Sequence, residues 1–179
     1  MKVRAHGFNL YFALATALAL LCGCQTDKQD KKPVSALRVH IEVNTDNANA
    51  GDLGTVQTIS VLRSDPVAVT IAHDPILTEA NVVAAAVINA PGGFAIEIRF
   101  DENGTWLLEQ YSASNPGKHF AIFGLWGEKL ANSRWLAAPI ITHRIANGLL
   151  AFTPDASREE ADALVLGLNN VAKTMQGKK

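Results

Sequence analysis

The segment from residue 94 to residue 175 most constrains the fold, because strand-like and helix-like patterns follow one another within it. Residues 94–100 alternate apolar and charged side chains, which is typical of a half-buried strand. A helix is predicted to begin after Asp101, a favourable N-cap, and to end before Pro116. Residues 119–126 are apolar at almost every position, which predicts a strand covered on both faces in the middle of a sheet.

The second half of this segment predicts two more strands and a final helix. Residues 135–142 are the expected partner of the preceding strand, and Pro139 marks an edge or a bulge because proline has no N–H to donate. Residues 149–152 give a short strand. Ser157 and Glu160 form a capping box, and apolar side chains then repeat at helical spacing.

The chain before residue 94 predicts further strands and one short helix. Residues 37–44 alternate, with His40 among the side chains expected to face water. Residues 56–62 and 67–71 predict two strands joined by a turn, and an alanine-rich helix is expected from Thr78 to about Ile88. These elements predict an α+β fold with a mostly antiparallel sheet and two to three helices packed on it.

The first 23 residues predict a lipoprotein signal peptide. An apolar run over residues 10–21 follows Lys2 and Arg4, and Leu21-Cys22-Gly23-Cys24 resembles a bacterial lipobox. Cys24 is the expected lipidated residue, because the small Gly23 precedes it. An ordinary secretory signal or an uncleaved anchor is the alternative.

The polar residues 24–36 predict a flexible tether, followed by a single domain over residues 37–179. We therefore expect the protein to be held by lipid chains at the bacterial cell envelope, facing the periplasm. Gln25 follows the lipidated residue, where inner-membrane lipoproteins of Gram-negative bacteria commonly carry aspartate. This difference favours the outer membrane over the inner one.

Charge and motif content argue against several classes of function. The formal net charge is −1 and no basic stripe is present, which argues against nucleic-acid binding. The lipoprotein leader and its lipidation site account for both cysteines, and no two histidines are closely spaced on one element. No metal or other cofactor is therefore expected, and the histidines are expected to face water. Nucleophile-elbow, Walker-loop and metalloprotease motifs are absent from the sequence.

A loop beside two tryptophans is the candidate binding region. Trp126 and Trp135 flank the polar segment 127–134, which predicts a hairpin-like loop, and Trp126, Arg134 and Trp135 are its candidate binding residues. Core packing of the tryptophans is the alternative. The acidic cluster that follows in the sequence is interpreted as the N-terminus of the final helix and not as a catalytic site, because acids are stabilised at the positive end of a helix dipole. Its members are Asp155, Glu159 and Glu160.

The order of elements resembles the head subdomain of the first periplasmic domain of SecD/SecDF protein-export membrane proteins. The similarity covers about residues 62–169 and rests on "FDENGTWLLEQYSASNPGKHFAI", "AAPII" around Pro139, the turn at Asn147-Gly148 and "FTPDASREEADALVLGLN". It implies a non-catalytic module whose partners are exported polypeptides or the export machinery. SecD-like proteins also carry transmembrane helices, whereas no apolar segment after residue 30 is long enough to span a bilayer.

The leading hypothesis is therefore a membrane-anchored, non-enzymatic binding or scaffolding module, with its oligomeric state open. One alternative is a structural envelope lipoprotein that pairs with itself or another chain through a sheet edge. Another is a hydrolase in which His119 or His143 meets Glu97 or Asp155, since acid–base partners must come within hydrogen-bond reach.

Overall fold

The structure, a computed structural model, describes residues 32–44 and 55–177. The expected signal peptide, Cys24 and most of the expected tether lie outside these residues. The described chain contains two α-helices and three sheets in which every strand pair is antiparallel. This confirms the α+β prediction, although the strands form separate sheets. None of the described helices combines the length and apolar character needed to cross a bilayer.

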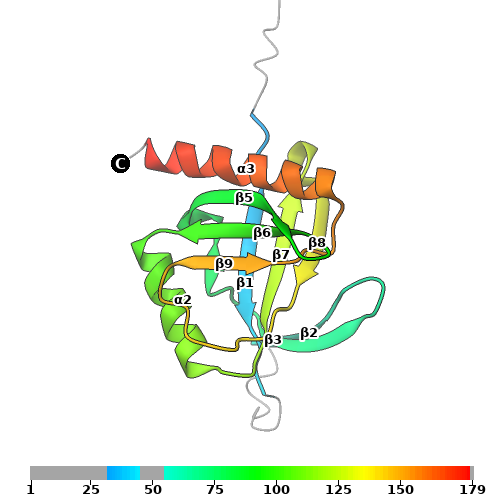
Figure 1. Cartoon of the computed structure of the whole chain (residues 1–179), viewed down its shortest axis with the longest axis vertical. Helices are drawn as coiled ribbons and strands as arrows, with labels where there is room; N and C mark the ends of the chain where they lie inside the picture. The colour runs from blue at the N-terminus through cyan, green and yellow to red at the C-terminus, as the bar shows by residue number, and fades with distance from the viewer. Residues whose placement is uncertain (1–31, 45–54, 178–179) are drawn as a thin grey trace, which may run out of the picture. The chain divides into compact units, whose positions relative to one another are not determined.

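Four strands form the first sheet, in the order β4-β1-β7-β8 (Figure 1). Strand β7 lies in its interior with five of seven residues buried, as its sequence predicted. Strand β8 is an edge strand of this sheet, but it ends before Pro139. The strands are β1 (Ala36–Ile41), β4 (Leu77–Thr78), β7 (Phe120–Trp126) and β8 (Asn132–Ala137).

Three further strands form a second sheet, made of β5 (Val82–Ala90), β6 (Gly93–Phe100) and β9 (Leu149–Phe152). The predicted helix from Thr78 to Ile88 is wrong. Thr78 does cap a helical turn, but this is the short 3-10 helix η2 (Glu79–Asn81), after which the chain extends as β5. The β-branched side chains in this segment favour the extended conformation over the helix that its alanines favour. They are Val82, Val83, Val87 and Ile88.

The two helices begin where their caps predict. Asp101 accepts a hydrogen bond from Gly104 N at the start of α2 (Glu102–Ser114), and the capping box of Ser157 and Glu160 opens α3 (Arg158–Gln176). Helix α3 lies along β5 at the top of Figure 1. The main apolar core fills the space between the two larger sheets and this helix.

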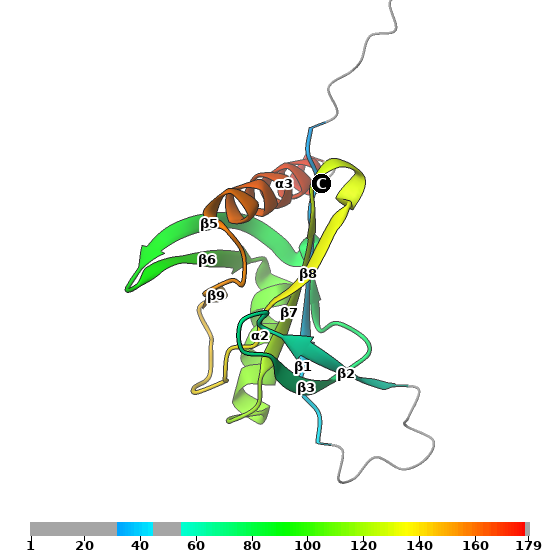
Figure 2. The same ribbon diagram turned by 90° about the vertical axis from the view of Figure 1, so that its right-hand side faces the viewer.

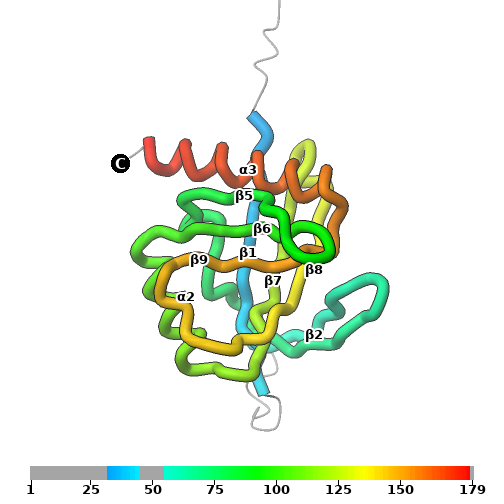
Figure 3. Tube along the Cα trace, in the orientation of Figure 1, coloured from blue at the N-terminus to red at the C-terminus, as the bar shows by residue number. Residues whose placement is uncertain are grey.

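Strands β2 (Val56–Val61) and β3 (Val67–Ala72) form a hairpin that projects from the rest of the domain (Figure 3). It packs against the face of the first sheet that is turned away from the main core (Figure 2), where Val69 and Ile71 contact Ala121 in a small second core. His40 lies beneath it, 5% exposed, and its Nδ1–H donates to Ala72 O at 3.0 Å. The expectation that His40 faces water is wrong, because the hairpin covers this part of the polar face of β1.

Candidate functional site

A hollow of about 310 Å³ lies beside β8, between the sheet and the turn of the β2–β3 hairpin. Phe123 and Trp135 form its floor, with ring centroids 4.9 Å apart. Trp135 also meets the His40 ring edge-on at 5.4 Å, so its indole is fixed by neighbours on two strands. The turn of the hairpin supplies the opposite wall through Leu62 and Pro66.

Leu62 adopts an unusual backbone conformation in this wall. Its φ is 68°, in the left-handed region, and its side chain is 40% exposed. A left-handed conformation costs an L-residue with a β-carbon about 1–2 kcal/mol. The turn therefore presents an apolar side chain to solvent beside the hollow.

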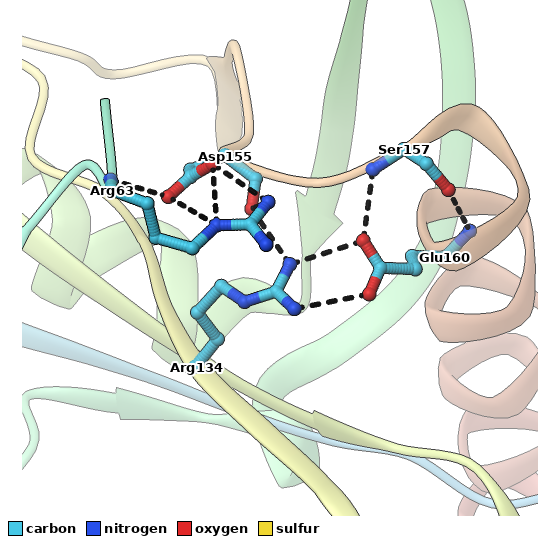
Figure 4. A network of polar contacts seen from close by, with 5 residues as sticks. All are labelled: Arg63, Arg134, Asp155, Ser157 and Glu160. Atoms are coloured by element: carbon cyan, nitrogen blue, oxygen red, sulfur yellow. Dashed lines mark hydrogen bonds and ion pairs between the residues drawn. The ribbon is translucent and has the colours of Figure 1, made fainter.

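An ion pair ties the turn to the chain just before α3 (Figure 4). Arg63 Nε donates to Asp155 Oδ2 at 3.1 Å and Nη2 donates to Oδ1 at 3.0 Å. The Arg63 backbone N–H also donates to Asp155 Oδ2 at 2.8 Å. The hairpin turn is thereby held over the rim of the hollow at a fixed position.

Arg134 extends this network to α3. Its Nη1 donates to Asp155 O and to Glu160 Oε2, both at 3.0 Å, while Nη2 donates to Glu160 Oε1 at 3.1 Å. This two-point contact with a carboxylate is the geometry that guanidinium groups favour. The guanidinium also lies 5.4 Å from the ring centroid of Trp126.

The network keeps its carboxylates ionised. The hydrogen bond from Arg63 lowers the pKa of Asp155, and the hydrogen bond from Arg134 lowers the pKa of Glu160. Neither carboxyl is a proton donor at neutral pH, and each guanidinium already has an anionic partner. The hollow therefore offers aromatic and aliphatic surface with a neutralised charged rim, which suits apolar side chains of a partner.

The structure brings two of the three predicted binding residues to this hollow. Arg134 and Trp135 line it, whereas Trp126 is 3% exposed and lies in the main core. The loop between β7 and β8 is shorter than predicted, because it contains the 3-10 helix η3 (Glu128–Leu130) and β8 begins at Asn132. A binding role for Arg134 and Trp135 stays a prediction.

Sequence reasoning missed the contribution of the hairpin turn. Asp155 was grouped with the helix-start acids, but it precedes α3 and instead binds Arg63. The acidic cluster was a usable signal that a cationic partner could be near. Nothing in the sequence identified that partner, since the two residues are 92 positions apart.

The pairs required by the hydrolase hypothesis are not hydrogen-bonded within residues 32–44 and 55–177. His119 Nδ1 instead lies 2.6 Å from Glu42 Oε2, and His143 Nδ1 lies 3.0 Å from Thr142 Oγ1. Glu97 lines a separate hollow on the three-stranded sheet. The described geometry gives no support to an acid–base site made from those pairs.

Comparison with known proteins identifies relatives of this fold. The family model "SecDF, P1 head subdomain" matches residues 55–172. A structure of SecDF, described as a membrane component that enhances protein export, is 20% identical with a TM-score of 0.51, covering 82% of this chain and 70% of that one. A second, SecDF in a super-membrane-facing form, has the same identity and TM-score, but the match spans 21% of that chain. No curated protein sequence matches.

Proposed function

The chain belongs to the SecDF P1 head subdomain family, and on this premise we propose that it is a lipid-anchored, non-enzymatic module that binds exported polypeptides or the export machinery. The observation that carries the proposal is the hollow beside β8. Its floor is aromatic, its wall presents the strained and exposed Leu62, and its charges are paired with one another. Such a surface suits apolar side chains of many sequences, as a protein that meets many exported chains requires.

The similarity to SecDF supports the choice of partner. SecDF is described as a membrane component that enhances protein export. The second SecDF match spans 21% of that protein, so the fold of this chain is similar to one part of it. We propose that this chain shares polypeptide contact with its relatives, while fold similarity by itself leaves the partner to be tested.

The lipobox supports an anchor at Cys24. At the start of the described domain, Asn170 Nδ2 donates to Pro33 O at 2.9 Å and Ser35 is 3% exposed, so this segment is fixed on α3. Gln25 after the expected lipidated residue favours the outer membrane over the inner one. Labelling with a palmitate analogue that is lost in Cys24→Ser tests this point.

The alternative function is a structural lipoprotein that associates through a sheet edge. The observation in its favour is strand β2, which pairs with β3 alone among the described strands. Sedimentation velocity of the full chain in detergent separates the two functions. A dimer at micromolar concentration would favour the structural function.

In vivo photo-crosslinking tests the proposed function. A photoreactive residue replaces the exposed Ser133 at the hollow, and the control replaces the exposed Thr174 on α3. We expect many secreted polypeptides or translocon subunits to be recovered from position 133 and few from position 174. Recovery of the chain itself, or of one unrelated envelope protein, from position 133 would contradict the proposal.

A further inference from the structure

The outer edge of β2 directs backbone groups away from the hairpin, and these groups have no partner among the described residues. His73 N donates to Thr55 O at 2.7 Å, so these two residues form a hydrogen-bonded pair of the antiparallel ladder. Hydrogen-bonded and non-hydrogen-bonded pairs alternate along such a ladder. The intervening β2 residues, which are Val56, Thr58 and Ser60, therefore point their N–H and C=O groups outward. The same alternation is seen on β3, where the outward Thr70 O accepts from Val43 N at 2.9 Å.

The outer edges of β5 and β8 are covered by other parts of the described chain. The side-chain amide of Asn169 on α3 makes two 2.9 Å hydrogen bonds with the N–H and C=O of Ala85, as a neighbouring strand would. Asp155 N donates to Leu136 O at 2.7 Å on the edge of β8. Covering of this kind prevents unwanted strand pairing. Within the described residues, β2 has no comparable cover.

The sequence of β2 also lacks the usual defences of an open edge. Its six residues, Val-Gln-Thr-Ile-Ser-Val, contain no charge, no proline and no glycine. Exposed edges normally carry lysine, proline or a bulge, because a flat uncharged edge accepts another strand. Nothing in β2 therefore opposes the addition of an extended chain.

The open edge and the hollow are contiguous. Ser60, one of the outward residues, lines the hollow together with Phe123 and Trp135. Of the two hairpin strands, β2 is the one in contact with β8, while β3 contacts β1. A strand added to β2 would run beside the exposed part of the β7–β8 face and place alternate side chains over its aromatic floor.

We propose that β2 binds an extended, unfolded polypeptide segment by strand addition, with alternate side chains of that segment in the hollow. This inference rests on the proposed function and states how that function is carried out. Backbone hydrogen bonds to Val56, Thr58 and Ser60 are independent of the partner's sequence, and the hollow adds a preference for apolar side chains.

A second copy of this chain is the competing occupant of the same edge. Antiparallel pairing of two β2 strands places a two-fold axis perpendicular to the hairpin, so both copies carry their large sheets on the same side. A second copy paired in this way would bring its own folded β7 and β8 strands to the side of the hairpin on which this chain's β7 and β8 lie. A single extended segment brings no folded sheet to that side, and this favours it as the occupant.

The test is binding of reduced, carboxymethylated lactalbumin, which stays unfolded, to the full chain purified in detergent. Thr58→Pro removes one outward N–H but none of the bonds to β3, and proline is tolerated at this kind of edge position. Thr58→Val is the matched control, because both variants lose the Thr58–Thr70 hydroxyl contact. Ser60→Lys adds a charge at the edge without removing a backbone donor.

We expect Thr58→Pro and Ser60→Lys to weaken binding about tenfold, and Thr58→Val to change it less than about twofold. Wild-type affinity in both Thr58→Pro and Ser60→Lys would overturn strand addition while leaving polypeptide binding intact. No binding by the wild-type chain would overturn the proposed function itself. If the wild-type chain is a dimer and Thr58→Pro dissociates it, the partner of β2 is a second copy of this chain and not an unfolded segment.

Discussion

Arg63 and Asp155 lie 92 positions apart and are joined by hydrogen bonds from the guanidinium and from the backbone N–H of Arg63. This pair sets the distance between the turn of the β2–β3 hairpin and the chain that leads into α3. Both residues line the hollow that we propose as the binding site, so the pair closes one side of it.

Replacement of Asp155 by asparagine tests this role. Asp155→Asn keeps the size of the side chain but removes the negative charge that interacts with Arg63 and Arg134. We therefore expect faster amide exchange at Arg63 N and weaker binding of an unfolded polypeptide. Asp162→Asn, at an exposed position of α3, is the matched control. Equal exchange rates in the two variants would show that the pair does not hold the turn.

The same network predicts loss of hairpin anchoring in acid. Asp155 and Glu160 have pKa values lowered from 3.8 and 4.5 in the fold, so the stability that they contribute is complete above about pH 4.5 and falls as each carboxyl is protonated below that. Amide exchange of the turn, measured from pH 6 to pH 3 and corrected for intrinsic rates, should rise in this window. Asp155→Asn should flatten the rise.

Local elements could be predicted from sequence because their signals are local. The capping box at Ser157, the N-cap Asp101 and the strand at residues 149–152 all depend on neighbours within a few positions. The burial of His40 depends on distant packing, because a hairpin remote in the sequence covers it. The helix expected over β5 is wrong for two reasons: its β-branched side chains favour an extended chain, and the strand packs between β6 and α3. The hollow combines residues from a local sequence signal with residues that distant packing brings to it. Arg134 and Trp135, beside a polar loop, could be predicted as site residues. Leu62 and Arg63 could not, because only the packing of the hairpin places them there.

Burial of His40 makes the packing of the hairpin dependent on pH below 6.5. Burial lowers the pKa of His40 from 6.5, so its stabilising contribution is present above that value and decreases as pH falls through the folded-state pKa. After correction for intrinsic exchange rates, we expect the amides of β3 to be less protected at pH 5 than at pH 7. His40→Gln keeps a donor for Ala72 O but does not titrate, so it should abolish this difference, whereas His73→Gln, at an exposed site, should retain it.

Gly167 allows the start of the domain to pass over α3. A β-carbon there would lie 2.0 Å from Ser35 Oγ and 2.7 Å from Ser35 N. Gly167→Ala should lower the free energy of unfolding by about 1–3 kcal/mol, as overpacking does. Gly177→Ala is the control, because its β-carbon would meet only Lys173 O at 3.4 Å. Urea denaturation with similar midpoints for the two variants would contradict this packing.

Replacement of Leu62 should change stability and binding in opposite directions. Leu62→Gly relieves the left-handed strain of about 1–2 kcal/mol, part of which the greater freedom of the unfolded chain offsets, so we expect a small rise in unfolding free energy. The variant also loses an exposed apolar side chain of the hollow, so the affinity for an unfolded polypeptide should fall. Unchanged affinity would mean that Leu62 takes no part in binding.

The most direct test of the central claim compares Trp135→Ala with Trp106→Ala in binding an unfolded polypeptide, followed by fluorescence anisotropy. Both variants remove an indole, but Trp135 forms the floor of the hollow, whereas Trp106 is 58% exposed on α2. With both variants shown to be folded by circular dichroism, we expect Trp135→Ala to lose about tenfold or more in affinity and Trp106→Ala less than about twofold. Equal affinities for the two variants would contradict polypeptide binding in the hollow.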